Sequence, residues 1–203
     1  NRVAIGSEAT HDADAGGSDA GDRPQTTELG KGYPLSNNGL LQECWSNRFL
    51  GIGRCNVALE DLQNENTIFV KSGNPVSKEI LARYVSEVKF LRAWYYFDLI
   101  TTFKEVPLVT EVQLPDTRLE KAAIEDIRVQ LFADLDDAIN DPNLPWIKDM
   151  DKSTELGRVS KEAAYMLKAR AALFFAGLME QNKMDGTAND EYTIAKNASK
   201  EVL

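Results

Sequence analysis

Histidine and cysteine are scarce in this chain of 203 residues, which has one histidine, His11, and two cysteines, Cys44 and Cys55. A Ser-His-Asp triad would have to centre on His11, and the sequence has no Gly-x-Ser-x-Gly nucleophile motif. Two cysteines and one histidine make neither a disulfide framework nor a dedicated zinc site. If both cysteines lie on one helix, they are about 16 Å apart, so we expect free thiols on a buried face.

Negative charge outweighs positive charge in the chain, and long apolar runs are scarce. The net charge is -9 and the pI is about 4.8. Because lysine and arginine are scattered rather than clustered, the sequence argues against nucleic-acid binding. No apolar run approaches the length of a bilayer span, and no basic-then-apolar signal segment is present. Any membrane attachment is therefore expected from residues outside this sequence.

Paired carboxylates are the remaining candidates for acid and base catalysis. Asp136 and Asp137 fall on a predicted helix with nothing to bury them, so a solvated face explains them better than a glycosidase pair does. Asp149 and Asp151 raise the same question in a polar connection. We expect no enzymatic activity from these residues.

A loop rich in Gly and Asp spans residues 12–22. It lacks Gly-Lys-Ser/Thr and is acidic, so it does not match a phosphate-binding loop. Its carboxylates could offer oxygen ligands to calcium, but their spacing fits no EF-hand; they are Asp12, Asp14, Asp19 and Asp22. We expect neither a metal nor a cofactor here.

Helical periodicity dominates the chain after residue 38. Apolar spacing, caps and breakers predict helices over 40–62, 77–102, 117–139 and 160–176, and from 189 or 190 onward. Residues 1–38 are rich in Gly, Asp, Ser and Thr and predict an irregular loop, either a solvated arm or a ligand-facing segment. No strand-rich region is predicted.

Local signals mark the ends and contacts of these helices. Ser77 and Ser160 are predicted N-caps, and the segment Thr117-Arg118-Leu119-Glu120 is a predicted capping box. Gly51 and Gly53 each cost about 1 kcal/mol relative to Ala inside a helix. They therefore predict a close approach by another part of the chain.

The most distinctive segment is 88–100, which Val106-Pro107 follows. Its apolar residues recur at helical spacing and predict one stripe covered by another helix; they are Phe90, Leu91, Trp94, Tyr95 and Leu99. Pro107 cannot continue the helix, so the chain is expected to leave extended.

Three motifs in a fixed order give this chain a family resemblance. The acidic loop at 12–22 precedes Gly51-Ile52-Gly53-Arg54-Cys55-Asn56, then comes the 88–100 run with its Val-Pro, and then the 157–164 motif GRVSKEAA. Together they resemble the SusD/RagB family. One departure is visible, because the family usually has Gly-Asp before the Val-Pro where this chain has Lys104 and Glu105.

The resemblance implies an all-α fold of antiparallel helical hairpins of tetratricopeptide-like type. Residues 1–203 would form the amino-terminal helical region of a longer protein, with an irregular part at 1–38 and helical hairpins at 39–203. The resemblance also implies a lipid-anchored protein at the cell surface, in the outer membrane. Its signal peptide and lipid-bearing cysteine would lie outside this sequence. Such a protein captures an oligosaccharide or polysaccharide and delivers it to a TonB-dependent, SusC-like transporter.

Glycan binding needs flat aromatic faces for sugar rings and polar side chains for hydroxyls. Trp45, Trp94, Tyr95 and Tyr96 are better explained as core residues. The ligand-binding candidates are the loop residues His11, Asp12, Asp14, Tyr33 and Trp146. The first three fall in a region that the family uses, whereas Trp146 can equally fill a hydrophobic gap.

A second function stays open at this point. The chain could be a structural helical adaptor that binds a protein partner and no sugar. A large exposed apolar groove without an aromatic loop residue at the surface would favour the adaptor.

Overall fold

The computed structural model of the chain describes residues 28–29, 37–64, 67–71, 73–114 and 117–203. They belong to two compact units that meet between Leu50 and Gly51, and each unit is described by itself. Most of the segment predicted to be irregular, 1–38, lies outside the described residues.

The described part of the first unit contains the start of helix α3 (Gly39–Gln63), which continues into the second unit. The side-chain oxygen of Asn38 accepts hydrogen bonds from the backbone N–H groups of Leu40 (3.2 Å) and Leu41 (3.4 Å). This satisfies donors that a helix start leaves without intrahelical partners. One turn apart on α3, the rings of Trp45 and Phe49 pack at 4.8 Å.

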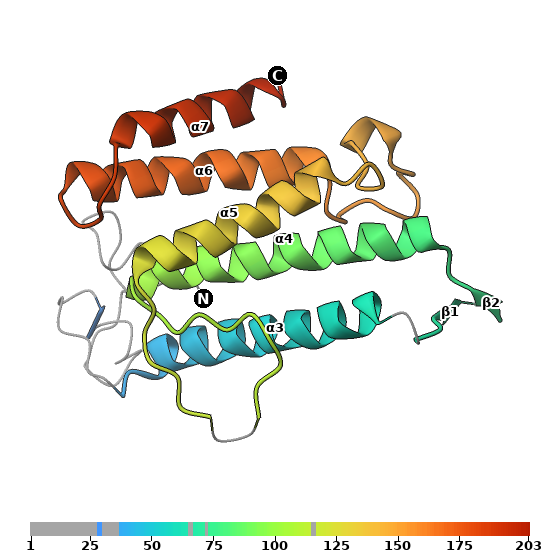
Figure 1. The fold of residues 1–203 in the computed structure, drawn as a ribbon, viewed down its shortest axis with the longest axis horizontal. Coiled ribbons are helices and arrows are strands. Elements are labelled where there is room, and N and C mark those ends of the chain that lie inside the picture. Colours follow the sequence, from blue (N-terminus) through green and yellow to red (C-terminus); the bar gives the residue numbers. More distant parts are fainter. Residues whose placement is uncertain (1–27, 30–36, 65–66, 72, 115–116) are drawn as a thin grey trace, which may run out of the picture. The chain divides into compact units, whose positions relative to one another are not determined.

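The second unit is built from helical hairpins. Its elements are β1 (Val70–Lys71), β2 (Asn74–Pro75), α4 (Lys78–Phe103), α5 (Ile124–Asn140), the 3-10 turn η1 (Ile147–Asp149), α6 (Lys161–Glu180) and α7 (Ala188–Lys200). Figure 1 shows α4 to α7 as successive antiparallel helices, each packed on the next. The two short strands pair antiparallel, with Val70 opposite Pro75. The predicted all-α, tetratricopeptide-like fold is confirmed.

The core of this unit lies between the helices and is largely aliphatic and aromatic. Leu131 and Leu135 on α5 and Ala171 and Phe175 on α6 are all fully buried, and the two helices pack on each other. Phe175 also packs edge-on against Phe132 at 5.7 Å. No helix in the described part of the chain is long and apolar enough to span a bilayer.

Two of the predicted caps are confirmed. The Ser77 hydroxyl accepts from the N–H of Ile80 at 3.4 Å, and the Ser160 hydroxyl accepts from the N–H of Ala163 at 3.3 Å. Each satisfies a backbone donor in the first turn of its helix.

The capping box predicted at Thr117 is wrong. Helix α5 begins at Ile124, and its N-cap, Ala123, has no side-chain cap bond. The Thr117 hydroxyl instead donates to the carbonyl of Leu114 at 2.8 Å, and the N–H of Ala122 donates to the carbonyl of Val106 at 3.0 Å. The predicted cap is thus part of the irregular connection before α5, which is tied to the chain after α4.

The predicted stripe on α4 is also wrong in part. Leu91 is 40% exposed and Trp94 37% exposed, so Trp94 is not the core residue that we expected. Arg92, Tyr96 and Asp98 are buried in their place. Tyr96 is fully buried, and its hydroxyl exchanges hydrogen bonds with the N–H (2.6 Å) and carbonyl (3.1 Å) of Val109. Burial raises the pKa of Tyr96 to about 12.

The buried guanidinium of Arg92 explains why this face of α4 points inward. Its Nε and Nη2 each donate to the carboxylate of Asp134 on α5 at 2.7 Å. Its Nη1 donates to the side chain of Asn56 at 2.9 Å and to the carbonyl of Thr110 at 3.1 Å. Asn56 in turn donates to the carbonyls of Val109 and Glu111, each at 3.0 Å. The cluster therefore ties α3, α4 and α5 to the segment that follows the Val-Pro.

The predictions for glycine and cysteine are confirmed in part. A Cβ on Gly51 would lie 2.4 Å from the Tyr95 ring, so this glycine does allow close packing. A Cβ on Gly53 would meet nothing within 4 Å. Cys44 and Cys55 are buried free thiols, as predicted.

Candidate functional site

Of the five ligand-binding candidates, one lies in the described part of the chain. His11, Asp12, Asp14 and Tyr33 fall outside the described residues, as do the possible calcium ligands. Trp146 lies in the connection between α5 and α6. It is half-buried, and its ring stacks on that of Tyr165 with centroids 5.8 Å apart and planes 18° apart.

The backbone around Trp146 is fixed by the first turn of α6. Trp146 is extended (φ -75°, ψ 153°), and η1 follows it. The N–H of Ile147 donates to both carboxylate oxygens of Glu162, at 3.0 and 2.9 Å. The carbonyl of Pro145 accepts from the N–H of Lys161 at 2.9 Å. These bonds on either side of Trp146 hold its ring over Tyr165, one turn into α6.

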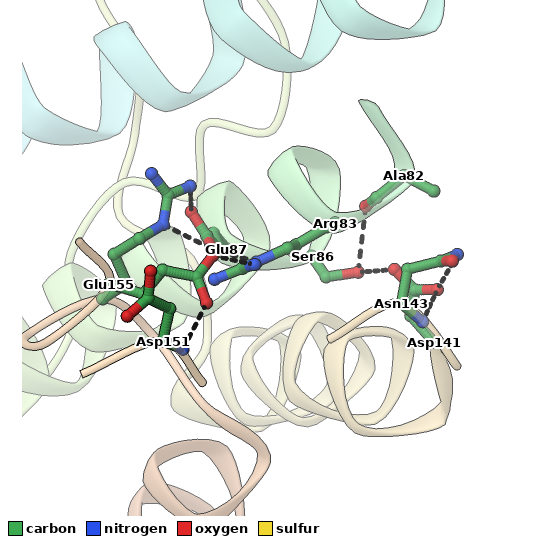
Figure 2. A network of polar contacts seen from close by, with 9 residues as sticks. Ala82, Arg83, Ser86, Glu87, Asp141, Asn143, Asp151 and Glu155 are labelled. Atoms are coloured by element: carbon green, nitrogen blue, oxygen red, sulfur yellow. Dashed lines mark hydrogen bonds and ion pairs between the residues drawn. The ribbon is translucent and has the colours of Figure 1, made fainter. Parts of the chain in front are cut away.

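An ionic network fixes the far side of the same connection to α4 (Figure 2). Arg83 contacts Glu155 at 2.5 Å and Glu87 at 3.0 Å. Glu87 also accepts from Arg158 at 3.1 and 2.5 Å, and the Arg158 guanidinium lies 5.2 Å from the centre of the Tyr84 ring. The hydrogen bonds from Arg158 to Glu87 raise the pKa of Arg158.

Glu155 joins this network to a tight turn within the connection. The N–H of Asp151 donates to the Glu155 carboxylate at 3.1 Å. This hydrogen bond and the one from Arg83 lower the pKa of Glu155. The Asp151 carboxylate accepts from the hydroxyl and N–H of Ser153 and from the hydroxyl of Thr154, and these bonds lower the pKa of Asp151.

A second polar anchor lies where the connection leaves α5. The Ser86 hydroxyl donates to the Asp141 carboxylate at 2.6 Å, and Asn143 donates to the same carboxylate from its backbone (2.9 Å) and side chain (2.8 Å). Figure 2 shows Ser86 reaching from α4 toward Asp141. Partial burial acts to raise the pKa of Asp141, but the hydrogen bonds outweigh it and the net pKa is lowered.

The connection combines fixed charges with an aromatic surface. Three carboxylates of the connection, those of Asp141, Asp151 and Glu155, have lowered pKa values, which keep them ionised rather than ready to donate a proton. In the described part of the chain, no group of three His, Cys, Asp or Glu residues could hold a metal ion. A stacked aromatic pair on a backbone fixed from both sides can present a ring to a flat apolar ligand surface.

The sequence did not identify Tyr165 as part of this site. It follows Ala164 on the helix, and the Ala-rich stripe beside it drew attention to packing alone. No local signal points to it, because its pairing with Trp146 depends on how the connection folds back onto α6.

The chain matches a SusD-like family model described as "Starch-binding associating with outer membrane" over residues 25–173. No curated protein matches the chain.

Several solved structures share this fold. A laminarin-binding SusD-like protein matches with 26% identity and a TM-score of 0.76, over 100% of this chain and 38% of its own. Surface glycan-binding protein A from Bacteroides uniformis matches with 25% identity and a TM-score of 0.71, over 89% and 38%. A SusD superfamily protein from Parabacteroides distasonis matches with 30% identity and a TM-score of 0.64, over 79% and 31%. The chain thus spans well under half the length of each of these proteins.

Proposed function

The chain belongs to the SusD-like family, and on that premise we propose that it captures an oligosaccharide at the cell surface and delivers it to a TonB-dependent outer-membrane transporter. The helical hairpins would act as scaffold and partner surface. Attachment to the outer membrane would come from a lipid anchor outside this sequence. Capture is an equilibrium that makes and breaks no covalent bond, so the protein is not an enzyme.

The observation that carries this proposal is the stacked pair of Trp146 and Tyr165. Aromatic faces stack on the apolar faces of sugar rings, and a side chain held in place before binding loses little conformational entropy when the ligand arrives. The Glu162 bonds to Ile147 and the Arg83–Glu155 ion pair hold the connection in place. Trp146 is the proposed sugar-binding residue in the described part of the chain, and His11, Asp12, Asp14 and Tyr33 stay proposed ligand-binding residues in their own right.

The pair also bears on the adaptor alternative. An adaptor was expected to show a large apolar groove and no aromatic loop residue at the surface. Trp146 is an aromatic loop residue with part of its surface open to solvent, which favours capture.

Affinity electrophoresis tests the proposal. The full-length mature protein and this chain would be run in gels containing laminarin, xyloglucan or amylopectin, with a non-binding protein as the mobility reference. Retardation of the full-length protein by at least one glycan is the expected result. Unchanged mobility of both proteins in every gel would contradict capture of these glycans and favour the adaptor.

A further inference from the structure

Three cavities of the second unit adjoin one another along α4. One of about 630 Å³ lies between the end of α3, the β1–β2 pair and the start of α4. A second, of about 400 Å³, lies between α4 and α5, and a third, of about 500 Å³, between α3, α4 and residues 110–112. The first and second share Ala82 and Val85, the second and third share Lys89, and the first and third share Gln63. Because neighbouring cavities share lining residues, they follow one another along α4, and the three are here called the α4 groove.

One face of α4 forms the floor of this groove. Lys78, Leu81, Val85, Lys89 and Arg92 all line it, and they recur at spacings of three or four residues, which places them on one side of a helix. From the first to the last of them the helix rises about 21 Å, at about 1.5 Å per residue. The α4 groove is therefore long enough for several sugar units in a row.

The chemistry of the lining changes along this length. Leu62, Phe69 and Leu81 provide apolar surface at the β1–β2 end. At the other end, Glu60 and Gln63 on α3 are exposed, and within the described residues their side chains have no hydrogen-bond or ion-pair partner. Polar groups without protein partners are free to bind a ligand's hydroxyl groups.

Charges of both signs balance in the middle of the groove. The ammonium of Lys89 on α4 pairs with the Asp137 carboxylate on α5 at 2.5 Å. Ser86 and Asp141 pair beside them, at the position that Figure 2 shows between α4 and α5. This balance offers no net positive field for a highly anionic ligand. The floor combines the apolar side chains of Leu81 and Val85 with three cationic ones, and the rim is polar. This mixture matches a neutral sugar chain, which presents apolar ring faces and hydroxyl edges.

We propose that the α4 groove binds a neutral, linear oligosaccharide along its length. This inference rests on the proposed function, and it adds a second contact region to the one at Trp146. The groove would select for chain length, because a longer oligosaccharide contacts more of its floor and rim.

A side chain that fills the midpoint of the groove tests this directly. Ala82 is half-buried and borders two of the cavities, so Ala82→Trp would block the path. Ile80→Trp is the matched control, because Ile80 is 43% exposed on the same helix and lines none of the three cavities. Both variants of the full chain would be compared with wild type in gels containing laminarin, xyloglucan or amylopectin. We expect Ala82→Trp to weaken binding of the retained glycan about tenfold or more and Ile80→Trp to leave it unchanged.

A second variant keeps the test valid if Ala82→Trp does not fold. Glu60→Ala combined with Gln63→Ala removes two exposed polar groups of the rim, and Asp61→Ala is its control on the same helix. We expect the double variant to bind several-fold more weakly than the control. For wild type, a hexasaccharide of the retained glycan should bind about tenfold more tightly than the disaccharide.

The outcomes separate the two proposals. If wild type is retarded while the groove variants bind equally well and oligosaccharide length has no effect, the groove inference is overturned and capture stands. If wild type and the full-length protein are retarded in none of the gels, capture of these glycans fails, and the groove inference fails with it.

Discussion

Arg92 shows at the scale of one residue why the buried face of α4 is not its most apolar one. Its guanidinium makes four hydrogen bonds to Asp134, Asn56 and Thr110, so its burial leaves little polarity unsatisfied. Leu91 and Trp94 are more apolar and are nevertheless exposed. Apolar spacing alone could not reveal this, because the partners of Arg92 are far away in sequence.

Removing this guanidinium should be costly. Arg92→Met would leave the Asp134 carboxylate, whose side chain is 2% exposed, without its cation, and we expect a loss of about 3–5 kcal/mol in the free energy of unfolding. Denaturant unfolding followed by circular dichroism measures it. Lys121→Met is the matched control, because the Lys121–Glu105 pair is exposed and should contribute under about 1 kcal/mol. Equal effects of the two variants would contradict a structural role for Arg92.

Lys104 ends α4 in a backbone conformation that favours glycine. Its φ is 66°, and its N–H donates to the carbonyl of Ile100 at 3.1 Å. This is the position where the SusD/RagB resemblance leads one to expect Gly. The turn therefore keeps a positive φ although the glycine is absent, and a side chain there is strained.

We expect Lys104→Gly to stabilise the fold by about 1 kcal/mol, which corresponds to roughly 2–4 °C in Tm for a chain of this size. The gain is the relief of strain minus the loss of the contact between the Lys104 ammonium and the Phe174 ring, at 5.0 Å. Differential scanning calorimetry measures it. Lys121→Gly is the control, because Lys121 does not have a positive φ, and it should not raise Tm. A lower Tm for Lys104→Gly than for wild type would contradict the prediction and show that the contact with Phe174 outweighs the strain.

At the scale of elements, the sequence predicted helices well wherever local chemistry decides their ends. Ser77 and Ser160 cap α4 and α6 because a hydroxyl needs only the next turn as its partner. Thr117 failed as a cap because its hydroxyl bonds back to Leu114, while the Ala122–Val106 bond, which joins residues 16 apart, ties the segment to the chain after α4. Trp146 was identified as a candidate from its loop position, but its partner Tyr165 depends on how the loop folds back, which local patterns do not encode.

The connection between α5 and α6 should loosen at low pH. The pKa of Asp141 in the folded state lies below its usual value of 3.8, so Asp141 stabilises the fold above that pH, and this contribution is lost as the pH falls through the lowered pKa. Ser86→Ala removes one of the responsible hydrogen bonds. We expect Ser86→Ala to lower the free energy of unfolding by about 1 kcal/mol at neutral pH, because solvent screens the partly exposed Asp141 carboxylate. At the most acidic pH, where Asp141 is protonated, the difference in unfolding free energy between Ser86→Ala and wild type should shrink.

Unfolding by urea across a pH series measures this dependence. Ser199→Ala is the control, because the Ser199 hydroxyl donates to the backbone carbonyl of Ala195 and to no titrating group. A difference between wild type and Ser86→Ala that is independent of pH would contradict the assignment to Asp141.

At the scale of the whole molecule, the helical hairpins of the second unit position the two surfaces that we propose bind a sugar chain. One is the aromatic pair on the α5–α6 connection, and the other is the α4 groove. Both are anchored by the side chains of α4, since Arg83 and Ser86 hold the connection and Val85 and Lys89 line the groove. Helices of this kind supply rigid surfaces rather than reactive groups, which fits capture without chemistry.

The most direct measurement is the binding of full-length Trp146→Ala to a glycan that retards the wild type, by isothermal titration calorimetry. Trp94→Ala is the matched control, because it removes a partly exposed tryptophan from α4 rather than from the connection. The capture account predicts about tenfold or greater loss of affinity for Trp146→Ala, since a stacked aromatic contributes on the order of 1–3 kcal/mol, and no loss for Trp94→Ala. Equal affinity of Trp146→Ala and wild type would contradict it.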